Sequence, residues 1–366
     1  MCATLSDQHR ETAPAAGAEP GVIFSLVVPM RNEERYVAET ISSLTGQDYP
    51  ADRFEILVVD GRSTDSSREI VSQLAREHPN LRLLDNPRQL ASAARNVGIR
   101  AARGRFIGIV DCHSFVRPDF LRTAEHLFQD TGADCLGRPV ELFIPTDSYV
   151  QRAIGAARTS WLGHNVTSPR YSSAVGATSP LSVGILYRRE AFDRVGLFNE
   201  EFGACEDVEF NARVEAAGLA AWTDPALRCY YHARGSLWAL FKQMKHYAYW
   251  RYRLLRAQRG GFHASQAAPA GALAVAAAAA LAGVMRAMPL WVAAALPAVY
   301  AALVIAASIR ATAARGFRYL PLLPAAYIAI HAGVAVGFWA GLLGEARSRL
   351  SRPAARRRVA ETAPRK

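Results

Sequence analysis

The sequence is poor in cysteine: its 366 residues contain five, at positions 2, 112, 135, 205 and 229. None of them forms a Cys-x-x-Cys pair, so neither a zinc cluster nor a disulfide framework is indicated, and a reducing compartment is the default. The first 20 residues contain no apolar run, which excludes a signal peptide there. We expect residues 1–20 to be a disordered lead. The chain from residue 21 onward should then stay in the cytoplasm unless a later segment moves it.

Basic residues are not in general excess. Lys and Arg outnumber Asp and Glu by 43 to 32 over the whole chain. However, residues 345–366 carry eight basic and two acidic side chains, and the segment 309–319 adds Arg310, Arg315 and Arg318. Only about +2 of the net charge of +11 therefore belongs to the first 308 residues. This distribution argues against a nucleic-acid-binding surface and defines residues 345–366 as a basic tail.

Residues 21–236 show an alternation of strand and helix patterns. Strand-like β-branched runs occupy residues 24–28, 56–59, 81–84 and 106–110. Between them, apolar residues recur at helical spacing. Repeats of about 30 residues predict an α/β domain with a mostly parallel sheet and helices on both faces. Ligands of such sheets bind at the carboxyl ends of the strands, so the polar residues that follow each strand are the candidates for chemistry.

Charged residues are absent from three long runs, 266–285, 288–308 and 320–343. Each run is near or above the length needed to cross a bilayer, so the region 263–344 is predicted to hold two or three transmembrane helices. Three spans place the basic tail outside. Two spans, without the first run, place the 309–319 segment outside. The positive-inside tendency favours basic segments in the cytoplasm, and neither arrangement keeps both of them there.

Aromatic and basic residues are interleaved between positions 237 and 262. This mixture occurs in proteins that bind single-stranded nucleic acid and in helices that lie on anionic lipid. Because the segment directly precedes the apolar runs, the second interpretation is favoured. We predict an amphipathic interfacial segment here, and no nucleic-acid partner.

Four polar motifs follow predicted strands or lie on the helix between them. The first two are Pro-Met-Arg-Asn-Glu-Glu at 29–34 and Asp-Gly-Arg-Ser-Thr-Asp at 60–65. Each alone is also explained by turn and helix-cap chemistry. The third places Arg95 on a helix of small residues, as either a solvated charge or a cation for a phosphate. The fourth places Asp111 and His113 at a strand end, where both side chains can reach one divalent ion.

Together, the four motifs in this order resemble the nucleotide-sugar half of a family 2 glycosyltransferase with the GT-A fold. The resemblance covers about residues 22–255 and includes Cys-Glu-Asp-Val-Glu at 205–209, which is similar to the acceptor motif of that family. The Asp-x-His form of the fourth motif and the segment 231–237 look most like succinoglycan-type exopolysaccharide glycosyltransferases. The fold expected from this resemblance is a GT-A domain followed by C-terminal transmembrane helices.

The resemblance also implies roles for individual residues. The donor-binding residues would be Pro29, Arg31, Asn32, Glu33, Asp60, Ser63, Asp65, Arg95, Asp111 and Arg234. Asp111 would hold Mg²⁺ or Mn²⁺, with His113 standing where most of the family has a second Asp, and with His232 as a further ligand or phosphate contact. Asp207, beside Glu206, would be the general base; an acidic start of a helix is the simpler alternative for this pair.

The chemistry required is clear from the reaction itself. Cleavage of a sugar–diphosphate bond leaves negative charge that a divalent cation and arginine side chains stabilise. A carboxylate opposite must accept the proton of the incoming hydroxyl, and a single displacement inverts the anomeric centre. The sequence thus predicts a multi-pass plasma-membrane enzyme with a cytoplasmic catalytic domain. The resemblance implies that it moves a sugar from a UDP or GDP donor to a lipid-linked saccharide in polysaccharide biosynthesis. The alternatives are a polyprenyl-phosphate glycosyltransferase and a non-catalytic membrane adaptor with the same fold.

Overall fold

The computed structural model describes residues 21–137, 139–144, 148–163, 173–257, 267–313 and 316–361. The predicted lead at 1–20, the end of the interfacial segment and the last five residues of the basic tail therefore lie outside the described residues.

The larger sheet has eight strands in the order β3-β2-β1-β4-β9-β6-β10-β8. Their bounds are β1 (Phe24–Met30), β2 (Phe54–Asp60), β3 (Leu81–Asp85), β4 (Phe106–Ile109), β6 (Cys135–Gly137), β8 (Gly176–Thr178), β9 (Gly184–Arg188) and β10 (Ala221–Thr223). The pairs among β3, β2, β1 and β4, and the pair β6–β10, are parallel, whereas β9 runs antiparallel to β4 and β6, and β8 to β10. The mostly parallel sheet and its four predicted strands are confirmed.

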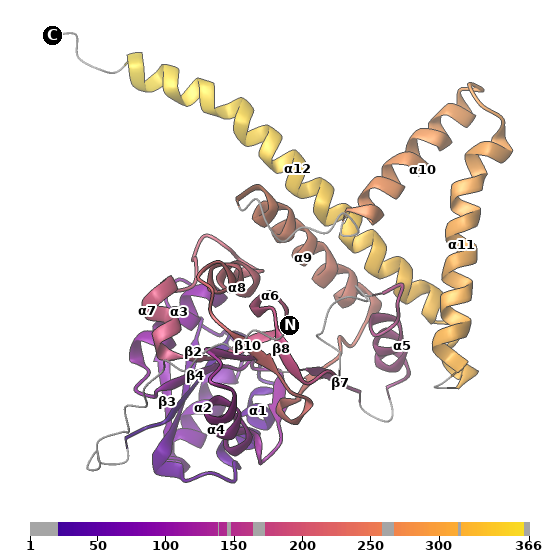
Figure 1. The fold of residues 1–366 in the computed structure, drawn as a ribbon. Coiled ribbons are helices and arrows are strands. Elements are labelled where there is room, and N and C mark those ends of the chain that lie inside the picture. The colour runs from indigo at the N-terminus through magenta and orange to yellow at the C-terminus, as the bar shows by residue number, and fades with distance from the viewer. Residues whose placement is uncertain are drawn as a thin grey trace, which may run out of the picture.

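Helices cover both faces of this sheet (Figure 1). On one face, α1 (Val37–Thr45), α2 (Ser67–Glu77) and α4 (Phe120–Thr131) share a core with Leu26 and Val28 of β1. On the other, α3 (Ala91–Ala101), α7 (Arg189–Val195) and α8 (Glu206–Ala216) pack around Val27. Leu26 and Val28 face one set of helices and Val27 the other, because successive side chains of a strand point to opposite faces of the sheet. The remaining short helices are α6 (Pro180–Val183), η1 (Ala51–Arg53), η3 (Pro225–Leu227) and η5 (Phe317–Tyr319).

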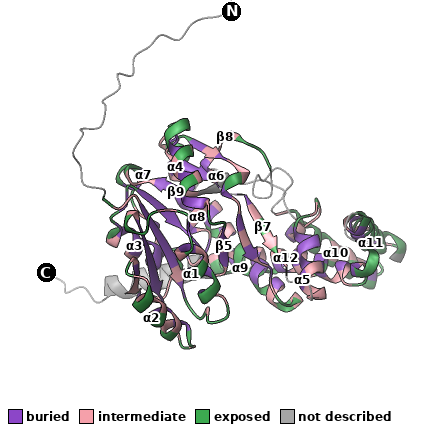
Figure 2. Cartoon of the chain, turned by 90° about the horizontal axis from the view of Figure 1, so that it is seen from below, coloured by how far each residue is buried: buried purple, intermediate pink, exposed green. Residues whose placement is uncertain are grey.

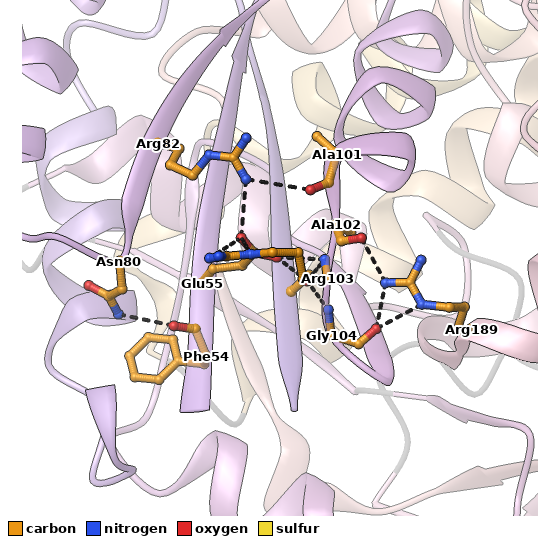
Figure 3. A network of polar contacts seen from close by, with 10 residues as sticks. Phe54, Glu55, Asn80, Arg82, Ala101, Ala102, Arg103, Gly104 and Arg189 are labelled. Carbon is orange, nitrogen blue, oxygen red and sulfur yellow. Dashed lines mark hydrogen bonds and ion pairs between the residues drawn. The ribbon is translucent and has the colours of Figure 1, made fainter. Parts of the chain in front are cut away.

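A buried carboxylate joins the elements at the amino end of the sheet (Figure 3). Glu55, near the start of β2, accepts hydrogen bonds from the Arg103 backbone N–H at 2.7 Å and from Ser25 Oγ at 2.8 Å, and it pairs with Arg82 at 3.3 Å. Burial opposes the charge, but these bonds and Arg103 lower the pKa of Glu55. Because this network lies at the end of β2 opposite Asp60, its role is to hold β1, β2, β3 and the end of α3 together.

A second, three-stranded sheet adjoins the carboxyl ends of the first. Its order is β5 (Ser114–Val116), β11 (Cys229–His232), β7 (Val140–Phe143), and β11 runs antiparallel to β5. The strand β5 begins directly after His113, so this sheet brings residues 229–232 next to the fourth motif. The helix α5 (Tyr149–Arg158) follows β7.

Four long helices form the C-terminal part: α9 (Leu237–Ala257), α10 (Ala268–Val284), α11 (Leu290–Ala313) and α12 (Leu323–Glu361). Two apolar segments, Trp291–Ala313 and Leu323–Ala346, are long enough to cross a membrane, and Ala268–Val284 is a shorter apolar helix. Much of α10 and α11 is exposed, in contrast to the buried strands of the sheet (Figure 2).

The helices α9 and α12 lie side by side and are in close backbone contact (Figure 1). Three glycines of α12, four residues apart, form the contact: Gly333, Gly337 and Gly341. A Cβ atom at Gly337 would lie 2.1 Å from the carbonyl oxygen of Lys245 and 2.9 Å from the Cβ atom of Ala248. Glycine is therefore needed along this face to let the two helices approach.

We expect Gly337→Ala to destabilise the protein although alanine is the better helix former. The gain of about 1 kcal/mol in helix propensity is outweighed by overpacking, which costs about 1–3 kcal/mol. Gly344 is the matched control, because a Cβ atom there meets nothing within 4 Å. Thermal unfolding in detergent should show a lower Tm for Gly337→Ala and an unchanged or higher Tm for Gly344→Ala. Equal Tm values for the two variants would contradict the close contact.

Candidate functional site

The first two motifs form one hydrogen-bonded unit. The backbone N–H of Asn32 donates to Ser63 Oγ at 2.9 Å, and Asn32 Oδ1 accepts from the backbone N–H of Thr64 at 2.8 Å. Glu34 also bridges the two motifs. Its backbone N–H donates to Asp65, and its side-chain carboxylate accepts from the N–H of Ser66. Asn32 and Arg62 have φ angles of 54° and 58°. The left-handed region is costly for non-glycine residues, so these bonds hold both loops in a shape that they would not adopt alone.

Asp60 lies at the base of this pair of loops. It is buried, and its Oδ1 accepts from the Ser63 backbone N–H at 3.1 Å and from Ser63 Oγ at 2.6 Å. Its other oxygen pairs with Arg68 Nη1 at 3.1 Å. Pro29 is half-buried at the end of β1, and the exposed Arg31 donates to the Gln89 carbonyl at 3.3 Å. The structure therefore gathers the predicted donor residues of both motifs at one edge of the sheet.

Arg95 joins the third motif to two others. Its Nη1 lies 3.0 Å from Glu206 Oε1, and its Nη2 lies 3.6 Å from Asp111 Oδ1. The side chain is 10% exposed, and its Nε is buried without a hydrogen-bond partner among the described residues. Burial works against the charge, but Glu206, Asp111 and Asp207 raise the pKa of Arg95. The guanidinium is a permanent positive charge between the fourth motif and the start of α8.

The structure separates the roles of Glu206 and Asp207. The helix α8 begins at Glu206, directly after Cys205, whose φ is 61°. Glu206 is 5% exposed; burial raises the pKa of its carboxyl, against the effect of Arg95. Asp207 is half-buried, and its Oδ1 accepts from the Val208 N–H at 2.8 Å. Glu206 is thus held in an ion pair with Arg95, whereas Asp207 has the more accessible carboxylate.

His113 faces Glu33 of the first motif. Its Nδ1 lies 3.0 Å from Glu33 Oε1, and its ring packs edge-on against Tyr231 at a centroid distance of 4.8 Å. Burial lowers the pKa of the imidazole, but the hydrogen bond to Glu33 and the charge of Asp111 more than compensate and raise it to about 9. The pairing with Glu33 therefore favours the protonated form of His113.

The structure does not bring His232 together with Asp111 and His113, the other predicted metal ligands. Successive side chains of β11 point to opposite faces, and Tyr231 is the neighbour of His113. His232 lies on the other face. Its ring is tilted against that of Tyr36 at a centroid distance of 4.7 Å, and its Nε2 lies 2.7 Å from Glu39 Oε2. Within the described ranges, no group of three or more His, Cys, Asp or Glu side chains could hold a metal ion. Asp111 remains as a strand-end carboxylate with a 39% exposed side chain.

Three cations surround Tyr231, and one of them, Arg158 of α5, was not predicted. Arg158 is buried and donates to Gln243 Oε1 of α9 at 3.3 Å, while Gln243 Nε2 donates to the Tyr231 hydroxyl at 3.0 Å. Burial alone would raise the pKa of Tyr231, but His113, Arg234 and Arg158 lower it. The Nε of Arg234 is buried without a hydrogen-bond partner in the described part of the chain. Arg234, a predicted donor-binding residue, thus lies near Tyr231, which packs against His113 of the fourth motif.

A cavity of about 670 Å³ lies elsewhere, between β7, α5 and η5. None of the predicted site residues lines it. Its two arginines already have partners, since Arg228 pairs with Glu141 at 3.1 Å and Arg152 donates to the Tyr319 hydroxyl at 2.8 Å. The strand-end cluster around Arg95 is the better candidate for catalysis, because it combines opposed carboxylates with cations at the edge where ligands of α/β sheets bind.

Residues 25–196 match the family model described as Glycosyl transferase family 2. The succinoglycan biosynthesis protein ExoA of Rhizobium meliloti (strain 1021) is 30% identical over 323 residues, which cover 87% of this chain and 94% of that protein. The chain belongs to glycosyltransferase family 2. The family and the expected likeness to succinoglycan-type proteins are confirmed, and the chain is a glycosyltransferase.

One further relative and one solved structure of similar fold are less similar in sequence. A dolichyl N-acetyl-α-D-glucosaminyl phosphate 3-β-D-2,3-diacetamido-2,3-dideoxy-β-D-glucuronosyltransferase of Methanococcus voltae is 25% identical, over 60% of this chain and 70% of its own. The mannosyltransferase PcManGT of Pyrobaculum calidifontis, solved with GDP-Man and Mn²⁺, is 24% identical, has a TM-score of 0.56, and is matched over 88% of this chain and 90% of its own. The second likeness confirms the GT-A fold.

Proposed function

We propose that this glycosyltransferase is a membrane-anchored, inverting enzyme that transfers a sugar from a UDP or GDP donor to a lipid-linked saccharide in exopolysaccharide biosynthesis. The observation that carries the proposal is the position of Arg95. One buried guanidinium contacts both Asp111, at the expected donor side, and Glu206, next to the expected base. A sugar–diphosphate bond between Asp111 and Asp207 would therefore break beside a fixed positive charge, which stabilises the leaving diphosphate.

Asp111 is the residue that would hold a divalent ion. Magnesium and manganese are commonly bound by one or two carboxylates together with substrate phosphates, and the half-exposed Asp111 provides such a carboxylate. His113 could join it through Nε2, because a histidine that binds a metal commonly gives its other ring nitrogen to a carboxylate, as Nδ1 does here to Glu33. When bound, the ion would supply positive charge to the diphosphate. Mn²⁺ in the mannosyltransferase of similar fold supports this assignment.

We assign the general base to Asp207. Its carboxylate is half-buried at the start of α8, next to the Arg95–Glu206 pair. It would accept the proton of the acceptor hydroxyl as that oxygen attacks the anomeric carbon. Glu206 would position Arg95. A single displacement of this kind inverts the configuration of the sugar.

The proposed acceptor rests on relatives and on the membrane helices. The relative from Rhizobium meliloti is a succinoglycan biosynthesis protein, and the one from Methanococcus voltae is named for a dolichyl-phosphate-linked sugar. We further propose that the catalytic domain lies on the cytoplasmic side of the plasma membrane. Direct transfer to polyprenyl phosphate is the alternative acceptor chemistry, and a non-catalytic adaptor is the alternative in which the fold only binds ligand.

The donor site is tested by calorimetric binding of UDP and GDP to the purified full-length protein, with and without Mn²⁺. We expect one nucleotide to bind in a metal-dependent way, and Asp111→Ala to weaken that binding by about tenfold or more, the effect of losing one favourable contact of about 1.4 kcal/mol. The exposed Asp130 provides a matched control, because Asp130→Ala removes the same charge away from the site. Folded protein that binds neither nucleotide would favour the adaptor.

A further inference from the structure

The apolar segment of α12 contacts the catalytic domain at its amino end and α9 at its carboxyl end. At its amino end, the Tyr327 hydroxyl donates to Ser160 Oγ at 2.8 Å, and His331 Nε2 lies 2.9 Å from the Leu162 carbonyl, just after α5. At its carboxyl end, Glu345 accepts from the Tyr252 hydroxyl at 2.5 Å and pairs with Arg256 of α9 at 3.0 Å. The candidate span Leu323–Ala346 therefore lies along other parts of the protein for its whole length, and 44% of an apolar 18-residue window within it is buried.

The helix α9 is itself attached to the catalytic domain. A Cβ atom at Gly203, in the loop before α8, would lie 2.7 Å from the ring of Trp250, and Gln243 bonds to Tyr231 of β11. The helix also carries exposed charges at Lys242, Lys245 and Arg253. If α12 crossed the bilayer, these charges and this side of the catalytic domain would have to enter the hydrocarbon core, which is strongly unfavourable.

The helices α10 and α11 are less restricted. Among the described residues, the carboxyl-terminal part of α11 packs on the catalytic domain, where Val304 and Ala307 share a buried cluster with Ile154 of α5. The two helices leave α12 at separate points and meet at a tip away from the catalytic domain (Figure 1). Near its base, α10 contacts α12 through a hydrogen bond from Trp339 Nε1 to the Ala270 carbonyl at 3.1 Å. Toward the tip, large apolar side chains are exposed, including Val284 at 79% and Trp291 at 76%. The 17 residues of α10 rise about 25 Å, the lower end of the length that crosses a bilayer.

We propose that α10 and α11 are the two membrane-crossing helices and that α12 lies at the membrane surface, on the side of the catalytic domain. This inference rests on the membrane attachment proposed above and specifies its topology. It differs from the pair that length and hydropathy select, which is α11 and α12. The outer face of α12, with Ile328, Val336 and Leu343 exposed, would contact the lipid, while α9 covers the opposite face.

The charge distribution supports this topology independently. With α10 and α11 crossing, the 309–319 segment with its three arginines and the tail with its eight basic residues both lie on the side of the catalytic domain. Arg286 at the tip is then the only basic residue of positions 266–308, and it lies on the far side. Two spans formed by α11 and α12 would place the 309–319 segment on the far side, and three spans would place the tail there. Only the α10–α11 pair satisfies the positive-inside tendency for both segments.

Four single-cysteine variants of the full-length protein distinguish the topologies. Ala51→Cys marks the catalytic domain, Ala287→Cys the tip, Ala313→Cys the end of α11, and Ala346→Cys the end of the apolar part of α12; all four positions are exposed. The parent carries Cys2→Ser. Its other cysteines should react little, because Cys112, Cys135 and Cys229 are buried and burial raises the pKa of Cys205 to about 12.

Each variant is treated with a membrane-impermeant polyethylene-glycol maleimide in right-side-out and in inside-out membrane vesicles. We expect positions 51, 313 and 346 to react from one side and position 287 only from the other. Reaction of 313 alone from the far side would establish α11 and α12 as the spans, and reaction of 287 and 346 from the far side would establish three spans. Either result overturns the inference, as does a position 287 that reacts from neither side. Protein that stays soluble and reacts at all four positions would instead reject membrane attachment itself.

Discussion

Replacement of Asp207 by Asn should abolish sugar transfer while leaving donor binding nearly intact. The amide keeps the size of the side chain but no longer accepts a proton, and loss of a general base lowers kcat by about 10²–10⁴. Glu206 is not expected to replace it, because its carboxylate is 5% exposed and lies 3.0 Å from the guanidinium of Arg95. Turnover and nucleotide binding are measured on the same purified protein.

Glu201→Gln is the control for this variant. Glu201 is an exposed carboxylate of the loop before α8, so the substitution makes the same change of charge and hydrogen bonding six residues earlier in the chain. We expect normal turnover from it. If Asp207→Asn also turned over normally, the base would have to be another group and α8 would merely begin with an acidic turn. If it lost donor binding as well, Asp207 would act in positioning the donor rather than in proton transfer.

The sequence was sufficient to predict structure where the pattern lies within one short segment of the chain. The runs that became β1 to β4 are β-branched and flanked by helical stripes, and the polar motifs follow those strands directly, so both the sheet and the edge that carries the site could be predicted. The strands β6, β8 and β10 have three residues each. Such short strands have no measurable period, and their place in the sheet depends on partners far along the chain.

At the site, too, the features that the sequence did not predict depend on contacts between residues far apart in the chain. The resemblance implies that His232 is a ligand or a phosphate contact, but the face of β11 on which it lies depends on the pairing of β11 with β5. Arg158 and Gln243 come from α5 and α9 and contact each other across 85 residues. For α12, hydropathy indicates burial in an apolar environment, but it does not distinguish lipid from another helix; the glycines at 333, 337 and 341 were the available signal for a helix partner.

The largest expected loss of stability comes from replacing Arg95 by Met. The substitution leaves the buried Glu206 without its cation, next to Asp111 and Asp207, and breaking one partner of a buried ion pair costs about 3–5 kcal/mol. We expect denaturant unfolding in detergent to show a decrease in the free energy of unfolding in this range, together with loss of activity. Arg100→Met, on an exposed position of the same helix, is the control and should change the free energy of unfolding by less than about 0.5 kcal/mol.

A second substitution separates stability from function at this position. Replacing both members of a buried ion pair by apolar residues of similar volume is often neutral, so Arg95→Met combined with Glu206→Met should recover much of the lost stability. The recovered protein should remain inactive, because the charge that the leaving diphosphate requires is still missing. If the double variant regained transfer with its fold, Arg95 would be needed only to neutralise Glu206, and the proposed stabilisation of the diphosphate would have to come from Arg234, Arg158 or the bound ion.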